Sequence, residues 1–403
     1  LRTLILSALI MITIDAASQT ISSGSHSYNI DKQKEWVQLR AIPKAKNTLD
    51  QSIQYLLIDE QLNLTNNNFE HYFHNAQKVI SEQGLKESAK VSLYFSPDYQ
   101  TLTIHNVRVI RNKRAIDHLQ AKNIELIRQE NEISNNIYNG LVTATIVIPD
   151  VRVGDIVEYS ATISGKNPVL GKQNFASFAA GWQVPVIENH IKVITDANRK
   201  LYTKLHNLNG NLQTTNINNT IAYTWSQNNV AAIFDEQEYP LINSPYPYIE
   251  FSEYETWADV TLWATDLYDI ENNDSAELKD FINQLKSTSS TDNEYIEKAI
   301  YFVQNEIRYF GIETGQNSHK PSKPNTVFYR RFGDCKDKTI LLNHLLSQIG
   351  IQAYPALVST RERGAIINNL PSPSNFNHVI SYFQFNDTPY WIDATRTFQY
   401  GTL

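Results

Sequence analysis

The chain has 403 residues and a net charge of −7, from 35 basic and 42 acidic side chains. Because it has no basic block, this charge argues against a nucleic-acid or anionic-membrane surface. Hydrophobic residues make up 41% of the chain and charged residues 19%, which is typical of a globular protein with about two or three domains. The single cysteine excludes an intramolecular disulfide and a multi-cysteine zinc site, so its thiol is either an inert core group or a nucleophile.

The first eighteen residues have the order of a secretory signal peptide. Arg2 precedes an apolar run from Leu4 to Ile14, and small residues follow at 16–18 before the sequence turns polar. The apolar run is about half as long as a membrane-spanning helix requires. The alternative is a buried strand or helix of the first domain. We favour export, and therefore expect a periplasmic or secreted protein that keeps no stable membrane span after removal of residues 1–18.

Residues 26–235 have the pattern of a β-rich domain. Apolar residues alternate with polar ones, and turn residues separate the runs, at 90–95, 102–109, 143–148 and 155–159, and 53–58 is the best strand candidate before them. The alternation slips by one at Asn106, which predicts a β-bulge. Further strands are expected at 190–194, 200–205 and 221–225, and a short helix or loop at 124–133. We predict a sandwich-like assembly for this domain.

The pattern changes after a proline-containing connector at 236–256. Apolar residues then recur at helical spacing in 259–267, 275–285 and 295–307, with Thr291 or Asp292 as the N-cap of the third helix. A helix over 335–349, ended by Gly350 in the left-handed conformation, precedes strands at 353–358, 378–385 and 390–392. The expected fold class is α+β, with a second domain over 257–403.

The single cysteine, Cys335, lies where a helix is expected to begin. Gly333 interrupts the preceding segment, and Asp334 is a favourable N-cap residue. The free N–H groups and the positive end of the helix dipole in this first turn favour the thiolate, which is the nucleophilic form. The charged neighbours at 334 and 336–338 sum to zero, so we assign them no net effect.

A thiolate enzyme also needs an imidazole and a third group that orients it. His378 begins an expected strand 43 residues after Cys335, and Asp393 follows the next strand 15 residues later. This spacing suits a hairpin that brings both side chains to one face. His344 and His319 are weaker candidates, because one lies more than two helical turns away and the other in a loop. From spacing alone, a catalytic and a purely structural interpretation are about equally supported.

Three segments resemble the core motifs of the transglutaminase-like superfamily, in the branch found in bacterial envelope proteins. They are Gly-Asp-Cys-Lys-Asp-Lys-Thr at 333–339, Phe-Asn-His-Val-Ile at 376–380 and Trp-Ile-Asp-Ala-Thr at 391–395, and the stretch 307–313 is also similar to that branch. The β-rich domain, with 153–159 and 183–186, resembles the domain of unknown function that commonly precedes such cores. The resemblance covers about residues 50–400 and is specific in the last hundred.

The resemblance implies a papain-like core, in which a helix packs on an antiparallel sheet. By carry-over, Cys335 is the nucleophile, His378 the acid and base, and Asp393 the orienting carboxylate. The backbone N–H of Cys335 is a natural first donor of an oxyanion hole, and Gln304 or Tyr309 is a candidate second donor. Similar proteins continue with further β structure, whereas this sequence stops ten residues after Asp393, as expected for a chain truncated at its C-terminus.

We therefore expect an exported thiol acyl-transfer enzyme of the cell envelope. Cys335 attacks an amide carbonyl of a protein or peptide substrate, and the thioester passes its acyl group to water or to an amine. The alternative is a non-catalytic envelope module whose core binds peptide or glycan, and a third interpretation is an assembly partner that docks through its β-rich domain. No cofactor and no metal are expected, since no acidic cluster indicates a calcium site. The substrate and the oligomeric state are left open.

Overall fold

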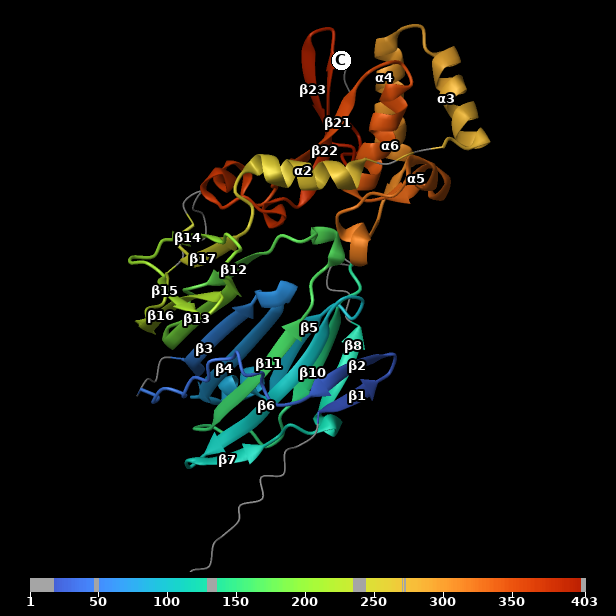
Figure 1. Ribbon diagram of the computed structural model, residues 1–403. Coiled ribbons are helices and arrows are strands. Elements are labelled where there is room, and N and C mark those ends of the chain that lie inside the picture. The colour runs from blue at the N-terminus through green and yellow to red at the C-terminus, as the bar shows by residue number, and fades with distance from the viewer. Residues whose placement is uncertain are drawn as a thin grey trace, which may run out of the picture.

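The computed structural model describes residues 18–46, 51–128, 136–234, 244–269, 271 and 273–399. A β-rich region forms the larger lower part of the molecule in Figure 1, and a helical region with its own small sheet lies above it. This arrangement agrees with the expected α+β class. The predicted signal peptide, apart from Ser18, and residues 236–243 of the predicted connector lie outside the described residues.

One long, mainly antiparallel sheet organises the β-rich region. Two contacts in it are parallel, between β3 and β13 and between β2 and β6. Its strands, in spatial order, are β1 (Gln19–Ser23), β2 (His26–Ile30), β6 (Thr101–Arg111), β11 (Ile156–Ser164), β4 (Glu70–Val79), β3 (Ile53–Asn63), β13 (Val186–Asp196), β16 (Thr220–Val230) and β15 (Gln213–Ile217), and β7 (Arg114–Asp117) also pairs with β6.

Two smaller sheets pack against the long one. The first has the order β5 (Lys90–Phe95), β10 (Val142–Val147) and β8 (Ile124–Arg128), and the second has the order β12 (Phe175–Ala179), β17 (Tyr248–Ser252) and β14 (Tyr202–His206). Leu93 and Ile146 of the first sheet share a core with Val157 of the long sheet. Phe251 of the second sheet shares another core with Val193. This layering buries the apolar face of each sheet.

The structure corrects two expectations in this region and confirms a third. Residues 124–128, expected as a short helix or loop, form β8, because their backbone pairs with β10. Residues 248–252 of the predicted connector form β17, which pairs with both β12 and β14 and so is part of a sheet. The expected bulge at Asn106 is present, since the register between β6 and β11 shifts next to this residue.

The helical region packs all of its α-helices except the first around one core and against a three-stranded sheet. Thr291 caps the helix Asp292–Tyr301, and Gly350 ends the last helix with a φ of +80°, as expected. The short helices α1 (Glu82–Ser88) and α5 were not expected. The elements are α2 (Trp257–Tyr268), α3 (Ala276–Thr288), α4 (Asp292–Tyr301), a π-helical turn (Phe302–Glu306), α5 (Pro324–Arg330) and α6 (Cys335–Ser347), followed by β21 (Ala353–Val358), β22 (His378–Phe385) and β23 (Thr388–Ile392).

Short strands and side chains join the two regions. β9 (Ile137–Tyr138) of the β-rich region pairs with β19 (Gly311–Ile312) of the helical region. The Nδ2 of Asn167 donates to the Gly315 carbonyl at 2.7 Å and to the Ser318 hydroxyl at 2.9 Å. The indole of Trp263 in α2 donates to the Val169 carbonyl at 2.9 Å. The β-rich region therefore supports the helical region directly.

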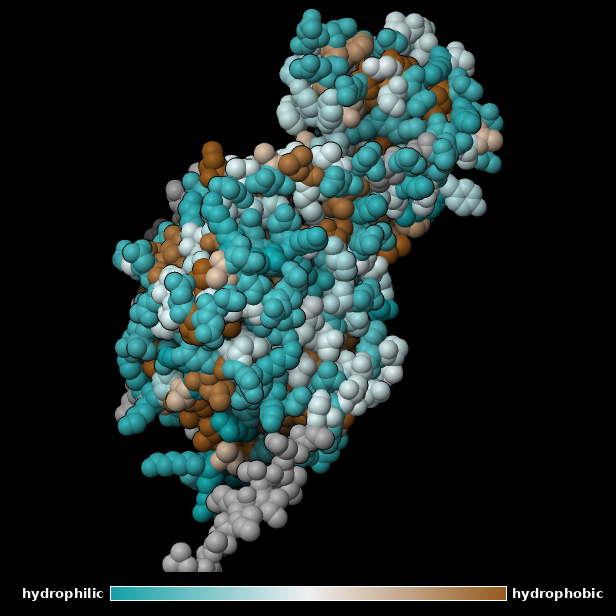
Figure 2. Space-filling model, in the orientation of Figure 1, coloured by the Kyte–Doolittle hydropathy of each residue, from teal (hydrophilic) through white to brown (hydrophobic). Residues whose placement is uncertain are grey.

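The molecular surface reflects this two-part arrangement. In the face drawn in Figure 2, a smaller upper lobe joins a larger lower one, and hydrophilic residues predominate on both. No helix within the described residues is both long and apolar enough to cross a membrane.

Candidate active site

Cys335 is the first residue of α6, as its sequence context predicted. Asp334 is the N-cap, and its Oδ1 accepts the backbone N–H of Asp337 at 3.3 Å. Gly333 allows the close approach of this turn, because a Cβ there would lie 2.6 Å from the Cβ of Asp337. Cys335 is buried, with 7% of its surface exposed, and it lines a cleft.

His378 and Asp393 come from the two strands of one hairpin. His378 begins β22 and Asp393 follows β23, while Asn386 and Asp387 form the turn between these strands with positive φ angles, a conformation that suits hairpin turns. The Nε2 of His378 lies 3.0 Å from Oδ2 of Asp393. His378 also lines the same cleft as Cys335. The structure therefore brings together all three residues selected from the sequence.

The electrostatics of His378 and Asp393 favour an ion pair. The hydrogen bonds to Asp393 and then to Cys335 outweigh burial and raise the pKa of His378 to about 10. Burial alone would raise the pKa of Asp393, but hydrogen bonds from His378 and Thr395 outweigh it and lower this pKa to about 2. At neutral pH the imidazole is therefore protonated and the carboxylate ionised.

A set of hydrogen bonds holds Asp393 in this orientation. Its Oδ1 accepts the backbone N–H of Thr395 at 2.9 Å and the Thr395 hydroxyl at 2.7 Å. The side-chain amide of Gln304 donates to the backbone carbonyl of Asp393 at 2.9 Å and to Oε1 of Gln399 at 2.8 Å. Gln304 lies in the π-helical turn, whose C-terminal carbonyl at Ile307 accepts a hydrogen bond from Nζ of Lys338 at 2.6 Å.

A buried ion pair lies beside Cys335. Lys336 and Asp334 are in direct contact, and only 4% and 1% of their respective surfaces are exposed. Glu313 lies 3.8 Å from the Lys336 ammonium group. Burial alone would lower the pKa of Lys336, but Asp334 and Glu313 outweigh it and raise this pKa. The ammonium group therefore stays charged in a site that excludes most water.

The cleft that contains Cys335 and His378 has a volume of about 640 Å³. Tyr268 and Tyr309 line it, and burial followed by the negative charge of nearby groups raises the pKa of both phenols. Tyr309 is held there by the pairing of β18 (Arg308–Tyr309) with β20 (Phe332–Gly333). The remaining lining residues are Ile137, Asn139, Trp263, Glu313, Ser318, His319, Lys336, Leu357, Arg361, Pro373, Phe376, Asn377 and Val379.

Sequence reasoning missed part of this cleft. Ile137 and Asn139 belong to the β-rich region, and Tyr268 lies on α2, so only tertiary packing brings them to the cysteine. His319 also lines the cleft, and its Nδ1 contacts the Ser318 hydroxyl at 2.8 Å, while burial lowers its pKa to about 4. His344, by contrast, pairs with Asp274.

No metal site is evident in the parts of the chain that the structure describes. Among those residues, no group of three or more His, Cys, Asp or Glu side chains is arranged to hold a metal ion.

Comparisons with known proteins found a family model that matches most of the β-rich region and a solved structure with a similar overall fold. A family model described as a Domain of Unknown Function, DUF3857, matches residues 65–234, as the sequence resemblance implied. A solved structure from Parabacteroides distasonis, named a "putative protease", covers 85% of this chain with a TM-score of 0.70 and 14% identity, and the match spans 67% of that protein. This likeness is one of fold alone.

A second structural match is too weak to support an argument. The M1 zinc metallopeptidase of Deinococcus radiodurans matches 49% of this chain and 42% of its own at 8% identity and a TM-score of 0.26, so we base no argument on it. No curated protein matches the chain.

Proposed function

We propose that this chain is a cysteine-dependent acyl-transfer enzyme with a papain-like, transglutaminase-like core that acts on amide bonds of proteins or peptides. The observation that carries the proposal is that Cys335 and His378, from two separate segments, line one cleft, while Asp393 contacts the imidazole of His378 at 3.0 Å. Nucleophile, acid and base, and orienting carboxylate are thus linked in the order that nucleophilic catalysis requires.

The chemistry follows from this order. The sulfur of Cys335 attacks the amide carbonyl carbon of the substrate as the thiolate, beside the protonated imidazole of His378. As the C–N bond breaks, His378 gives its proton to the leaving amine, and a thioester remains. His378 then takes a proton from water or from an incoming amine, which attacks the thioester and releases the thiolate. The products are a carboxylic acid and an amine, or a new amide.

Two groups are suited to stabilise the oxyanion that forms during attack. The backbone N–H of Cys335 is the first, because it lies at the free N-terminus of α6. Tyr309 is the better second donor, since its side chain lines the cleft. The amide of Gln304 is already engaged with Asp393 and Gln399. We therefore assign the second donor to the Tyr309 hydroxyl.

Hydrolysis is the favoured outcome over transamidation. The support is the likeness in fold to the Parabacteroides protein, whose name refers to proteolysis. We also propose export to the periplasm or the medium, on the strength of the signal-like order of residues 1–18.

A peptide-turnover experiment tests this function. The full chain is incubated with a tryptic digest of casein in ¹⁸O-labelled water, with and without hydroxylamine, and new peptide termini are identified by mass spectrometry. Hydrolysis places one ¹⁸O in each new carboxyl group, whereas transfer to hydroxylamine gives a hydroxamate. We expect new termini with wild type and none with Cys335→Ala or His378→Ala, while the matched control His344→Ala stays active. Products that persist in Cys335→Ala would contradict the assignment.

A further inference from the structure

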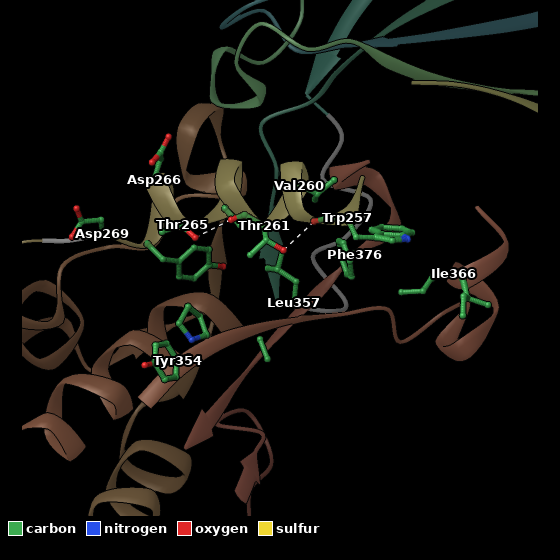
Figure 3. A pocket seen from close by; sticks show the side chains of 15 residues that line it. Trp257, Val260, Thr261, Thr265, Asp266, Asp269, Tyr354, Leu357, Ile366 and Phe376 are labelled. Atoms are coloured by element: carbon green, nitrogen blue, oxygen red, sulfur yellow. Dashed lines mark hydrogen bonds between the residues drawn. The ribbon is translucent and has the colours of Figure 1, made fainter. Parts of the chain in front are cut away.

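A second, larger hollow adjoins the candidate active site. It has a volume of about 820 Å³ and lies between α2, strand β21 and the 3₁₀ helix η8 (Arg363–Asn368) (Figure 3). Tyr268, Leu357 and Phe376 line both this hollow and the cleft of Cys335 and His378. We call it the α2–β21 groove. Because three residues are shared, a ligand in the groove lies directly beside the candidate active site.

The walls of the groove are mainly apolar. Figure 3 places Trp257, Val260 and Thr261 of α2 along one side, with Leu357 of β21 opposite. The hydroxyl of Thr261 donates to the Trp257 carbonyl at 3.0 Å, and that of Thr265 to the Thr261 carbonyl at 2.9 Å. Since both hydroxyl protons are used within the helix, these two threonines contribute mainly their methyl groups to binding.

One wall of the groove is the edge of a strand. β21 pairs only with β22 among the described strands, and four consecutive residues, 354–357, line the groove. A strand that presented one face would contribute only alternate residues. The Val358 carbonyl accepts the N–H of Asn377 at 3.1 Å and so points toward β22. Because backbone groups alternate, those of Leu357 and Pro355 point to the free edge, where Pro355 has no N–H to satisfy.

The η8 side of the groove is fixed in place by the β-rich region. The segment that follows η8 is tied to β17: the N–H of Leu370 donates to Oε2 of Glu250 at 3.0 Å, and the Ser252 hydroxyl donates to the Pro371 carbonyl at 2.6 Å. The groove is therefore largely preformed, which reduces the entropy that a ligand loses on binding.

We propose that the α2–β21 groove binds an extended peptide segment with apolar side chains, next to the amide that reacts at Cys335. This inference rests on the proposed function. The free backbone groups of β21 pair with the peptide main chain, as in β-strand addition, and the apolar walls receive its side chains. The volume lies within the range of preformed ligand sites, about 300–1,000 Å³. Exposed carboxylates of Asp266 and Asp269 at the Tyr354 end disfavour acidic side chains there.

The experiment measures binding without chemistry, in the full-length Cys335→Ala variant. Two blocked octapeptides differ only in three residues before a central Gln-Gly, Leu-Val-Phe in one and Ser-Thr-Asn in the other. Titration calorimetry gives their dissociation constants, and dodecanoate serves as an acyl-chain probe. The same titrations follow in Cys335→Ala carrying Thr261→Glu, and in a matched control carrying Leu262→Glu, an exposed α2 position outside the groove.

We expect the apolar peptide to bind at least about ten-fold more tightly than the polar one, with this preference lost in Thr261→Glu and kept in Leu262→Glu. Circular dichroism checks that each variant is folded, and Thr265→Glu repeats the test if Thr261→Glu unfolds. Equal binding of both peptides, or a preference that survives both groove variants, would overturn the proposal. Binding of dodecanoate in place of peptide would overturn it in favour of an acyl chain.

Failure of the groove and failure of the acyl-transfer chemistry are separable. Binding is measured in a variant that lacks the thiol, so it does not depend on turnover. If the apolar peptide is preferred but wild type forms no product, the proposed groove is supported and the proposed acyl transfer is contradicted. If wild type forms product but neither peptide is preferred, the acyl transfer is supported and the groove is contradicted.

Discussion

His378 and Asp393 set the pH range in which the candidate site is charged. The raised pKa of His378 means that its contribution to the free energy of unfolding is complete below its ordinary value of 6.5 and is lost as pH rises through about 10. The lowered pKa of Asp393 means that its contribution is complete above its ordinary value of 3.8 and is lost as pH falls through about 2. Both contributions are therefore complete between pH 3.8 and 6.5.

The substitution Asp393→Asn tests this electrostatic assignment. It keeps an acceptor for the imidazole N–H but removes the charge that raises the pKa of His378. We expect the alkaline limb of the kcat/KM profile, near pH 10 in wild type, to move down by about 1–3 pH units, as the loss of a close opposite charge predicts. The profile is measured with a peptide substrate in both proteins. An unchanged alkaline limb would show that another group controls it.

The substitution Gln304→Leu tests whether Gln304 positions Asp393. Without its amide, the carbonyl of Asp393 loses a donor and the carboxylate loses part of its support. We expect kcat to fall by about ten-fold or more with little change in KM, because small displacements of reacting groups are costly. Asn305→Leu, at the neighbouring position of the same turn, is the control. Equal losses in both variants would assign the effect to the turn as a whole.

At the residue scale, the site residues that local sequence patterns encode could be predicted, whereas residues that only tertiary packing brings to the cleft could not. The spacing of Cys335, His378 and Asp393 followed from one helix start and one hairpin, both visible in the sequence. Tyr268 carries no such signal, because its place in the cleft depends on how α2 crosses the sheet. Gln304 was considered only as an oxyanion donor, although its hydrogen bonds link it to Asp393.

The start of α6 depends on a buried ion pair as well as on a cap. Asp334 both accepts the N–H of Asp337 and pairs with Lys336. We expect Asp334→Ala to lower the free energy of unfolding by about 3–5 kcal/mol, because it leaves Lys336 buried without its main partner. The double variant Asp334→Ala, Lys336→Met should recover most of this loss apart from about 1 kcal/mol for the cap.

Denaturant unfolding of the wild type, both single variants and the double variant measures this coupling. Additive losses would contradict a direct Asp334–Lys336 interaction.

Elements with one dominant periodicity were predicted best. The bounds of β5, β21 and β22 agree with the sequence pattern, and α6 begins at the expected residue. β8 was missed because its run of Ile124, Leu126 and Ile127 among charged residues fits no single period, and its pairing with β10 decides its conformation. α5, with Pro324 at its start and only seven residues, is too short for a helical stripe to be recognised.

On the scale of the whole molecule, the β-rich region supplies part of the cleft wall. Asn167 binds the Gly315–Ser318 turn, and His319, the next residue, lines the cleft. We expect Asn167→Ala to lower kcat/KM by about ten-fold while the reactivity of Cys335 stays unchanged, because the substrate wall moves and the three reacting groups do not. Asn216→Ala, on the exposed strand β15, is the control. A parallel fall in Cys335 reactivity would contradict this division of roles.

The contact between the β-rich and helical regions could not be predicted from the sequence. The pairing of β9 with β19 joins two short segments more than 170 residues apart, and neither has the length or alternation of a strand. The α+β class and the order of its two parts were predictable, since each part carries its own periodicity. How the parts meet depends on complementary surfaces that no local pattern encodes.

The most direct test of the account is the rate of Cys335 alkylation by iodoacetamide as a function of pH, in wild type, His378→Ala and His344→Ala. Cys335 is the only cysteine, so the measured rate belongs to it alone. We expect rapid alkylation that persists below neutral pH in wild type and in His344→Ala, and its loss in His378→Ala. Slow alkylation in all three proteins, rising only near pH 8.5 as for an ordinary thiol, would contradict it.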